Sequence, residues 1–556
     1  MKRKLLFIIL LLATFPYSIY GRIIERVYLQ TDKQLYISGE PILLKIYTTG
    51  IEGKLQEFSK IGYVELLSDT EAEVRIKLEI KNGIGIGQME LPLMLGTGNY
   101  KLSAYTRYMR NEGEYVFFEK MITVINPSFL RENAVEAEQP QTTLVGAISQ
   151  PSTVQLTVNK NRLGKREKGI ITIAGLPEEY ASLAVSIAGE PPFFYGGKSI
   201  TDWKNNLRQP TESFARESFL PEYEGAIISG QLVDNETSTP VFMQNASVLL
   251  TFPGKEIQIY SGQSERDGIY NFYTKDIAGK KELTTTVFPD FENTCRLDLL
   301  SPFSSHSFES LPPLYLDSMW KECLSMQNLS LQVMRAYIGD STIRIHPQSP
   351  HNVLTPFRQY ILNEYTRFQR IEEIFIEFIM EARIRKINDK RVFSVLSDAK
   401  KGFSSDYILV LLDNIPVIDH DLICNYNAML LERIDIYQGR HIFGGQLYGG
   451  IIHFITNKGD HPNIRFESYT QLFDFEGAQP YRYFYSPDYE KRDNSTRMPD
   501  FRHTLLWEPL IDSKDGKSIT VPFYTSDIPG KYDVRVEGIS RDGKIINAVL
   551  QIEVAE

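Results

Sequence analysis

The segment ERVYLQTDKQLYISGEPILLKIY, residues 25–47, decides how the first part of the chain folds. Two runs rich in β-branched and aromatic residues flank a short polar turn. Asp32 in this turn can accept hydrogen bonds from backbone amides, and Gly39 can adopt a positive φ that other residues avoid. The pattern therefore predicts two neighbouring strands at the edge of an antiparallel sandwich, with Tyr36 packed against them.

The same pattern continues downstream. Short alternating runs at residues 63–67 and 100–105 are separated by glycine-containing turns, which is typical of an antiparallel sandwich. We therefore predict a sandwich over residues 22–127. Residues 131–143 are rich in Glu, Gln, Ala and Asn and contain few apolar residues, so we predict a linker over residues 128–150.

The sequence also predicts strands for the middle of the chain. Residues 151–224 are predicted to form a second sandwich. Its last part, 191–224, contains Pro, Gly and Asn without periodicity, which predicts a long exposed loop or a tether between domains. Residues 225–290 are predicted to form a compact third β-sandwich, in which Asp267-Gly268 supplies the positive φ of a hairpin turn. Connecting strands are expected over 291–351.

An α/β domain is predicted over residues 352–460. Apolar residues recur there at helical spacing, with glutamates between them: Ile371, Ile374, Phe375, Phe378 and Ile379. Such a helix either packs on a sheet or offers its acidic face for docking. The runs 409–412 and 451–455 carry apolar residues on both faces of the strand at several positions, which favours buried central strands. The final residues, 461–556, are predicted to form one more sandwich.

Composition limits the classes of function. A chain of 556 residues is long enough for three or four domains. It carries 60 Lys and Arg residues against 70 Asp and Glu residues, and this net charge of −10 disfavours a nucleic-acid partner. Its three cysteines, Cys295, Cys323 and Cys424, can form at most one disulfide, so a disulfide framework is excluded.

The beginning of the chain indicates export. A basic run, Lys2-Arg3-Lys4, precedes nine apolar residues at 5–13, which are too few to span a bilayer. We predict a signal peptide over residues 1–21, with an uncleaved membrane anchor as the alternative. No later segment has 18 consecutive apolar residues. The mature protein is therefore expected in the periplasm or at the outer membrane, without a transmembrane span.

The opening segment resembles a macroglobulin-type domain. Members of that family carry Thr-Asp-Lys, then an aromatic residue, then Gly-Glu, and this chain has Thr31-Asp32-Lys33, Tyr36 and Gly39-Glu40 in that order. GTGNYKLSAYTR, residues 96–107, resembles the closing hairpin of the same domain. The shorter segment 526–544 is similar in pattern, so the resemblance implies a macroglobulin-like fold for the last sandwich as well.

Two further resemblances cover the middle of the chain. Residues 228–272 resemble the carboxypeptidase regulatory-like sandwich, an accessory fold without catalytic machinery; the matching positions are Gly230, Asp234, Pro240, Val241, Ala246, Val248 and Asp267-Gly268. Residues 407–459 are similar to the second half of a TonB-dependent receptor plug domain. A receptor also needs a barrel of about 22 strands, and the residues that follow are too few to form one. The combination resembles envelope proteins of Gram-negative bacteria.

Motifs that carry chemistry are missing. Cys323 is followed by Leu-Ser-Met-Gln and not by the Gly-Glu-Gln of a thioester, and neither a His-Glu-x-x-His nor a Gly-x-Ser-x-Gly motif is present. We therefore predict no catalytic, cofactor-binding or metal-binding residues. The expected function is a non-catalytic envelope scaffold that binds an outer-membrane or periplasmic protein. The alternatives are a macroglobulin-like protease inhibitor or surface-defence protein without a thioester, with 191–224 as its bait segment, and a hydrolase.

The export hypothesis makes a direct prediction. Exported protein should begin near Arg22, because cleavage after Gly21 removes the basic and apolar run. N-terminal sequencing of the protein from the cell envelope measures this. Recovery of chains that still begin with Met1 would contradict signal cleavage and support the membrane anchor.

Overall fold

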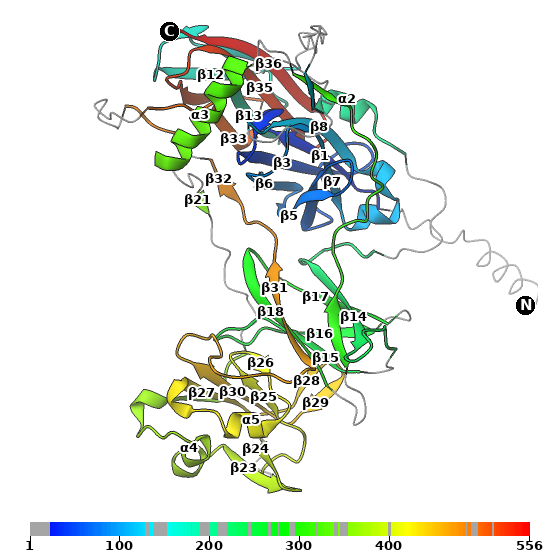
Figure 1. Cartoon of the computed structure of the whole chain (residues 1–556), viewed down its shortest axis with the longest axis vertical. Helices are drawn as coiled ribbons and strands as arrows, with labels where there is room; N and C mark the ends of the chain where they lie inside the picture. Colours follow the sequence, from blue (N-terminus) through cyan, green and yellow to red (C-terminus); the bar gives the residue numbers. More distant parts are fainter. Residues whose placement is uncertain are drawn as a thin grey trace, which may run out of the picture.

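The computed structural model describes much of the chain beyond residue 22. The described ranges are 23–127, 134–136, 153–179, 181–189, 199–209, 219–242, 246–264, 268–275, 277–288, 295–316, 321–337, 343–344, 354–397, 402–484, 486–490, 499–513 and 516–556. The predicted signal peptide and most of the predicted linker lie outside them. Figure 1 shows two lobes joined by a waist: two sandwiches form the upper lobe, and a third sandwich and an α/β domain form the lower lobe. The protein is mainly β, as predicted.

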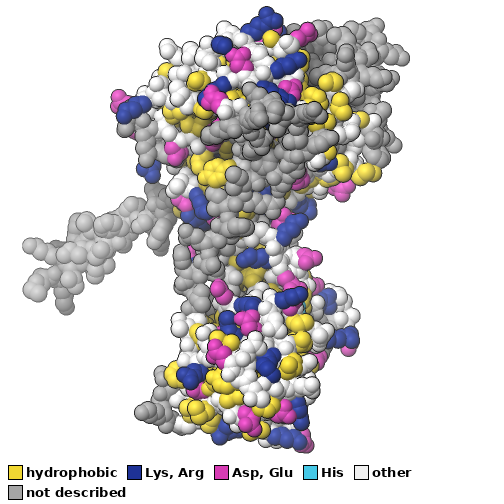
Figure 2. Space-filling view, turned by 90° about the vertical axis from the view of Figure 1, so that its left-hand side faces the viewer, with side chains coloured by type: hydrophobic (Ala, Val, Ile, Leu, Met, Phe, Trp, Pro, Cys, Tyr) yellow, Lys and Arg dark blue, Asp and Glu magenta, His cyan; other side chains and the backbone are white. Residues whose placement is uncertain are grey.

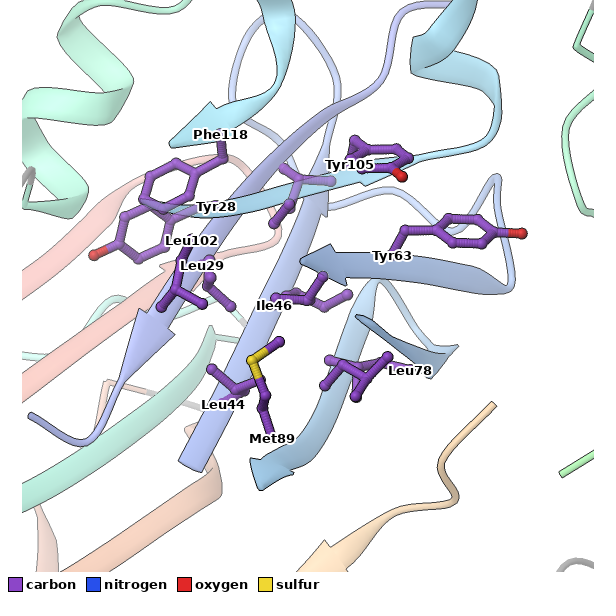
Figure 3. Packing of buried hydrophobic residues seen from close by; sticks show 14 of the residues in the cluster. Tyr28, Leu29, Leu44, Ile46, Tyr63, Leu78, Met89, Leu102, Tyr105 and Phe118 are labelled. Carbon is purple, nitrogen blue, oxygen red and sulfur yellow. The ribbon is translucent and has the colours of Figure 1, made fainter. Parts of the chain in front are cut away.

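The first sandwich contains eight strands between residues 26 and 125. They are β1 (Arg26–Thr31), β2 (Leu35–Ile37), β3 (Pro41–Thr49), β4 (Ile61–Leu67), β5 (Ala72–Lys81), β6 (Ile84–Glu90), β7 (Gly98–Thr106) and β8 (Phe118–Ile125). Their order is β1-β3-β6-β5-β4-β7-β8-β2, and β5 connects the two layers because it pairs with β4 along most of its length and with β6 at its end. Figure 3 shows the core between the layers, where Leu44, Ile46 and Leu78 meet.

The turn that the sequence singled out has the predicted structure. The Tyr36 hydroxyl donates to Asp32 Oδ1 at 2.8 Å, and the Leu43 amide donates to the same oxygen at 3.2 Å. Gly39 has a φ of +90°. Tyr36 is fully buried. The second carboxylate oxygen of Asp32 accepts a 2.9 Å bond from Thr504, so this turn also contacts the end of the chain.

The second sandwich combines two distant parts of the chain. Its strands are β10 (Gln155–Val158), β11 (Arg162–Leu163), β12 (Lys168–Ala174), β13 (Ala181–Gly189), β33 (Thr504–Ser513), β34 (Ile519–Tyr524), β35 (Gly530–Ser540) and β36 (Ile545–Val554). One sheet has the order β10-β12-β34, and the other has the order β11-β36-β35-β13-β33. Separate sandwiches over 151–224 and 461–556 are therefore wrong: neither half has enough strands to bury its apolar face, and β12 and β13 pair with the C-terminal strands.

The third sandwich is larger than the predicted range 225–290. Its strands are β14 (Ile227–Asp234), β15 (Val248–Thr251), β16 (Ile259–Ser264), β17 (Ile269–Tyr273), β18 (Lys280–Val287), β19 (Cys295–Leu299) and β31 (Thr470–Glu476). β31 was assigned to the C-terminal sandwich. It pairs instead with β18, and its Phe473 and Phe475 pack against the core of the third sandwich.

The α/β domain has a five-stranded sheet in the order β22-β27-β30-β25-β26. Its elements are β22 (Arg358–Ile361), α4 (Ile371–Glu377), β23 (Ala382–Ile387), β24 (Lys390–Val395), β25 (Leu409–Leu412), β26 (Ile415–Pro416), α5 (His420–Cys424), β27 (Leu431–Tyr437), β28 (His441–Phe443), β29 (Gln446–Tyr448) and β30 (Ile451–Thr456). The parallel strands β25 and β30 are fully buried, as their sequences indicate.

Both faces of this sheet are covered. On one face, Phe375 of α4 packs against Phe393 and Phe454, with ring centroids 5.2 Å and 6.1 Å apart. On the other face, Leu411 and its neighbours form one apolar cluster with Leu249 of the third sandwich. The structure thus favours the prediction of a helix packed on its sheet over an acidic docking face. The helix ends at Glu377, two residues before Ile379, the last position of the apolar spacing.

The connecting segments contain helices that the sequence did not indicate. α2 (Ile200–Asn205) lies within the predicted loop, and its Ile200 and Trp203 are buried against the first sandwich. α3 (Lys321–Tyr337) lies where only strands were expected. The small pairs are β9 (Ala134–Glu136) with β20 (Leu314–Leu316), and β21 (Ile343–Arg344) with β32 (Arg482–Tyr483). In the described part of the chain, no helix is both long and apolar enough to cross a membrane.

The packing of α4 gives a testable prediction. Phe375→Asp would place an unpaired charge against the rings of Phe393 and Phe454 and should destabilise the α/β domain by about 3 kcal/mol or more. Limited proteolysis should then cut within residues 352–460 while residues 22–126 stay resistant.

The matched control is Ile376→Asp, since Ile376 is the next residue of the same helix and 81% exposed. It should leave the cleavage pattern unchanged. If Phe375→Asp unfolds the whole chain in one step, the domains are not separate folding units. If it has no effect, the packing of α4 on the sheet is wrong.

Candidate functional site

Residues 477–481 cross the waist between the lobes and run along the first sandwich. The Gln479 amide donates to the Lys77 carbonyl at 2.7 Å, and its side chain exchanges two hydrogen bonds with the backbone of Gln88, at 2.8 Å and 3.1 Å. Tyr481 donates to the Ile84 carbonyl at 2.6 Å. Residues 477–481 therefore extend β31 out of the lower lobe and along the edge of β5 and β6.

A cavity of about 450 Å³ lies at this waist, between β5 of the first sandwich and β14 and β31 of the third. Its aromatic and charged lining consists of Tyr63, Phe303, Phe473, Phe475, Arg75, Lys77, Asp474 and Glu476. Figure 1 shows β5 at the base of the upper lobe and β31 rising toward it from below. We call this space the waist cavity. Its volume lies within the range of small-molecule sites in proteins.

Alternation along β4 and β5 places polar side chains at the cavity. Val64 and Ile76 point into the sandwich core, so Tyr63 and Lys77, one position away, point outward to the waist. Tyr63 stacks on Tyr105 of β7 with ring centroids 5.5 Å apart. Figure 3 shows these two tyrosines on the side of the sheet away from Ile46.

Lys77 is the cation that enters the cavity. It is 7% exposed, and its Nζ lies 4.4 Å from the centroid of the Phe475 ring. Among the described residues, its ammonium group makes no hydrogen bond or ion pair. Burial lowers the pKa of Lys77 to about 8, although the charges of Glu222 and Glu476 oppose this shift.

Glu222 lies beneath the cavity wall and is fully buried. Its carboxylate accepts hydrogen bonds of 2.9 Å from the Tyr63 hydroxyl and from the Ile227 amide. Burial raises the pKa of Glu222 to about 7 despite these bonds and the nearby charge of Arg107. Arg107 in turn donates to Ser229 at 3.1 Å. These contacts attach the start of the third sandwich to the first.

A second buried carboxylate, Glu65, lies on the same sheet face. It accepts hydrogen bonds from Tyr105, from His306 Nε2 at 2.7 Å and from Arg75 Nε at 2.8 Å. Burial opposes its ionisation, but the hydrogen bonds from His306 and Tyr105 outweigh burial and lower the pKa of Glu65. Arg75 is thus neutralised by Glu65, and the segment around His306 is attached to the first sandwich.

The lower lobe has its own polar joint at the turn Asp413-Asn414, which links β25 to β26. Both residues are buried and have positive φ values, 45° and 67°. Asn414 Nδ2 donates to the carbonyls of Phe252 at 2.9 Å and Gln258 at 3.0 Å, both in the third sandwich. Asp413 accepts a 2.7 Å bond from the Thr456 amide. The turn therefore fixes the α/β domain to the third sandwich.

The outer edge of β22 has no partner strand among the residues that the structure describes. β22 is the terminal strand and, within the described ranges, pairs only with β27. Phe357 and Ile361, 59% and 43% exposed, lie on one side of it. We call these two residues the β22 edge patch.

No catalytic, cofactor-binding or metal-binding residue was predicted from the sequence. In the ranges that the structure describes, no group of three or more His, Cys, Asp or Glu side chains could hold a metal ion. Cys295 and Cys424 are buried in different domains. The sequence did not single out Lys77 or Glu222. Glu222 lay in a segment without periodicity, and Lys77 follows the ordinary alternation of a strand.

Comparisons with known proteins gave structural matches only. No protein-family model and no curated protein sequence matches this chain. Among solved structures, an alpha-2-macroglobulin from Salmonella is 10% identical with a TM-score of 0.25, over 96% of this chain and 39% of that one. The native alpha-2-macroglobulin of Escherichia coli is also 10% identical with a TM-score of 0.25, over 96% of this chain and 40% of that one.

An adhesin from Escherichia coli is 9% identical with a TM-score of 0.16, over 49% of this chain and 62% of that one. The chain thus spans about two fifths of the length of the macroglobulins that it matches. At these TM-scores the matches carry no argument about this protein. Its fold class rests on its own sheets.

Glu222 gives a pH prediction. Its pKa is about 7 in the folded protein and about 4.5 in the unfolded chain, so between these values the folded state binds the extra proton. The stability from Glu222 is therefore present at low pH and is lost as the pH rises through 7. Between about pH 5.5 and about pH 8, the loss should be about 2 kcal/mol.

Denaturant unfolding at the two pH values, for wild type and Glu222→Gln, measures this contribution. The variant should lose less stability over this interval. Glu224→Gln is the control, because Glu224 is nearby and its side chain is 59% exposed. Equal pH dependence in wild type and Glu222→Gln would show that Glu222 is ionised in the folded protein over the whole interval.

Proposed function

We propose that this protein is a non-catalytic binding scaffold of the cell envelope, exported by residues 1–21, which docks a protein of the outer membrane or periplasm at the edge of its α/β domain. The observation that carries the proposal is the uncovered β22 edge with its apolar patch. An unpaired strand edge presents free backbone donors and acceptors, and partner proteins use such edges to add a strand.

The geometry of β22 suggests what the partner offers. Phe357 and Ile361 are four residues apart in an extended strand, so they lie on the same face. Tyr360 has the opposite orientation and is buried on the helix side, where its hydroxyl donates to Glu381. A partner segment with apolar side chains at alternate positions would pair with β22 and cover Phe357 and Ile361.

The resemblance of residues 407–459 to a receptor plug domain supports a partner in the outer membrane. A receptor plug is surrounded by its barrel, whereas the sheet of this domain is covered by α4 and by the third sandwich. The domain is therefore held by its own chain, and its remaining edge is available to another protein. The resemblance of residues 228–272 to a carboxypeptidase regulatory-like sandwich fits an accessory role for that unit.

The surface shown in Figure 2 agrees with a protein partner. On that face, Lys and Arg side chains alternate with Asp and Glu side chains over both lobes. A phosphate backbone binds best to a continuous field of positive charge. The interspersed charges and the net charge of −10 both favour a protein partner over a nucleic acid.

The structure gives the protease-inhibitor alternative little support. That function needs an exposed bait segment, for which 191–224 was the candidate. Several described residues of this segment are buried, namely Ile200 and Trp203 in α2, and Glu222 beneath the waist cavity. The prediction that the whole segment is an exposed loop is therefore wrong.

Affinity capture tests the proposed binding function: the protein serves as bait for proteins from the envelope of the cells that produce it. Wild-type protein should retain a specific outer-membrane or periplasmic protein, and Phe357→Lys combined with Ile361→Lys should weaken this binding by about tenfold or more, because two charges enter the apolar contact. Hydrogen exchange with the purified partner should show new protection of the β22 amides.

Ile442→Lys on the β28–β29 hairpin is the matched control, because Ile442 is also apolar and is 70% exposed. This variant should bind the partner like the wild type. Retention of the partner by the β22 double variant, or no specific envelope partner for the wild type, would contradict the proposal.

A further inference from the structure

The waist cavity contains a cation, Lys77, for which the described part of the chain provides no ion pair or hydrogen bond. Lys77 is more than nine-tenths buried and lines the cavity, and within the described ranges its Nζ contacts a ring face but no carboxylate. Buried ammonium groups are normally ion-paired or hydrogen-bonded, because loss of hydration costs several kcal/mol. The other cation of the lining, Arg75, is already paired with Glu65 at 2.8 Å.

We propose that the waist cavity is a binding site for a small carboxylate with an aromatic or branched apolar body, whose carboxylate pairs with Lys77. This site is separate from the β22 edge, and the inference does not depend on the proposed function. The ligand class follows from three properties of the cavity: one cation that is unpaired among the described residues, apolar walls, and carboxylates beside that cation.

The aromatic lining of the waist cavity determines which apolar group the ligand carries. Phe303, Phe473 and Phe475 come from two different segments and face the cavity together with Leu300. Aromatic rings bind planar or branched apolar groups through a large contact area and preferred edge-to-face or stacked arrangements. The ring of Phe475 also lies against Lys77, so one side of the cavity offers a cation next to an aromatic surface. A ligand with a charged end and an apolar end matches this arrangement.

The charges limit the ligand to a single negative charge. Asp474 and Glu476 line the same cavity, and Glu222 is close enough to Lys77 to influence it electrostatically. A dianion such as a phosphate monoester would bring a second negative charge, and no further unpaired cation of the described lining could compensate the loss of its hydration. A carboxylate monoanion is neutralised by Lys77 alone. The cavity therefore favours a carboxylate over a phosphate.

The position of the site implies an effect on the two lobes. Its lining comes from β5 in the upper lobe and from β31 and residues 299–303 below it. A ligand in the cavity would contact both sides and add interactions between them. Because it binds only when these surfaces are together, it stabilises the closed waist by mass action.

Calorimetric titration of the full-length mature protein with 2-naphthoate and with its neutral analogue 2-naphthamide tests the inference. 2-Naphthoate should bind about tenfold more tightly than the amide or better. Lys77→Gln should weaken 2-naphthoate binding by a similar factor and remove the preference for the charged probe, while Phe475→Leu should weaken both probes.

Lys531→Gln is the control, because Lys531 is an exposed lysine on β35, away from the waist. This variant should bind both probes like the wild type. Equal affinity for the two probes, unchanged 2-naphthoate binding in Lys77→Gln, or no binding of either probe at millimolar concentration would overturn the proposal. Thermal denaturation of each variant checks that it is folded.

Discussion

β13 is hydrogen-bonded on both sides by strands from the far end of the chain, and the rest of the architecture depends on this pairing. Ala181 lies opposite Ser513 in β33 and opposite Ser540 in β35. The second sandwich is therefore complete only after the whole lower lobe has been made. The third sandwich and the α/β domain are thus inserted between β13 and β33, and the chain between these two domains returns to the upper lobe, where His306 and Ser330 contact Glu65 and His503.

This constraint explains the density of contacts at the waist. Closing a long loop costs conformational entropy, and a folded insertion with adjacent ends lowers that cost. Gln479, Glu222 and His306 belong to three different crossings of the waist, and each forms hydrogen bonds with the first sandwich. Within the upper lobe, the buried Lys45 on β3 donates to Ser182 and Leu183 at 3.0 Å, which joins the two sandwiches.

The sequence predicted features with a local cause and missed features set by distant contacts. The Asp32 turn, the buried strands β25 and β30, and α4 each follow from residues close together in the chain. The partners of β13 could not be predicted in this way, because periodicity identifies a strand but not its neighbour. Lys77 and Glu222 were missed for the same reason: their burial comes from segments that fold over the outer face of the first sandwich.

The course of residues 477–481 has a mechanical consequence. The bridge between Leu78 and Gln479 is parallel, so this segment runs in the same direction as β5 while it leaves the lower lobe. When a force pulls the α/β domain away from the upper lobe, the tension acts along this strand. Its hydrogen bonds are then loaded in shear and must break together, whereas a perpendicular attachment would peel open one bond at a time. The waist is thus built to resist extension.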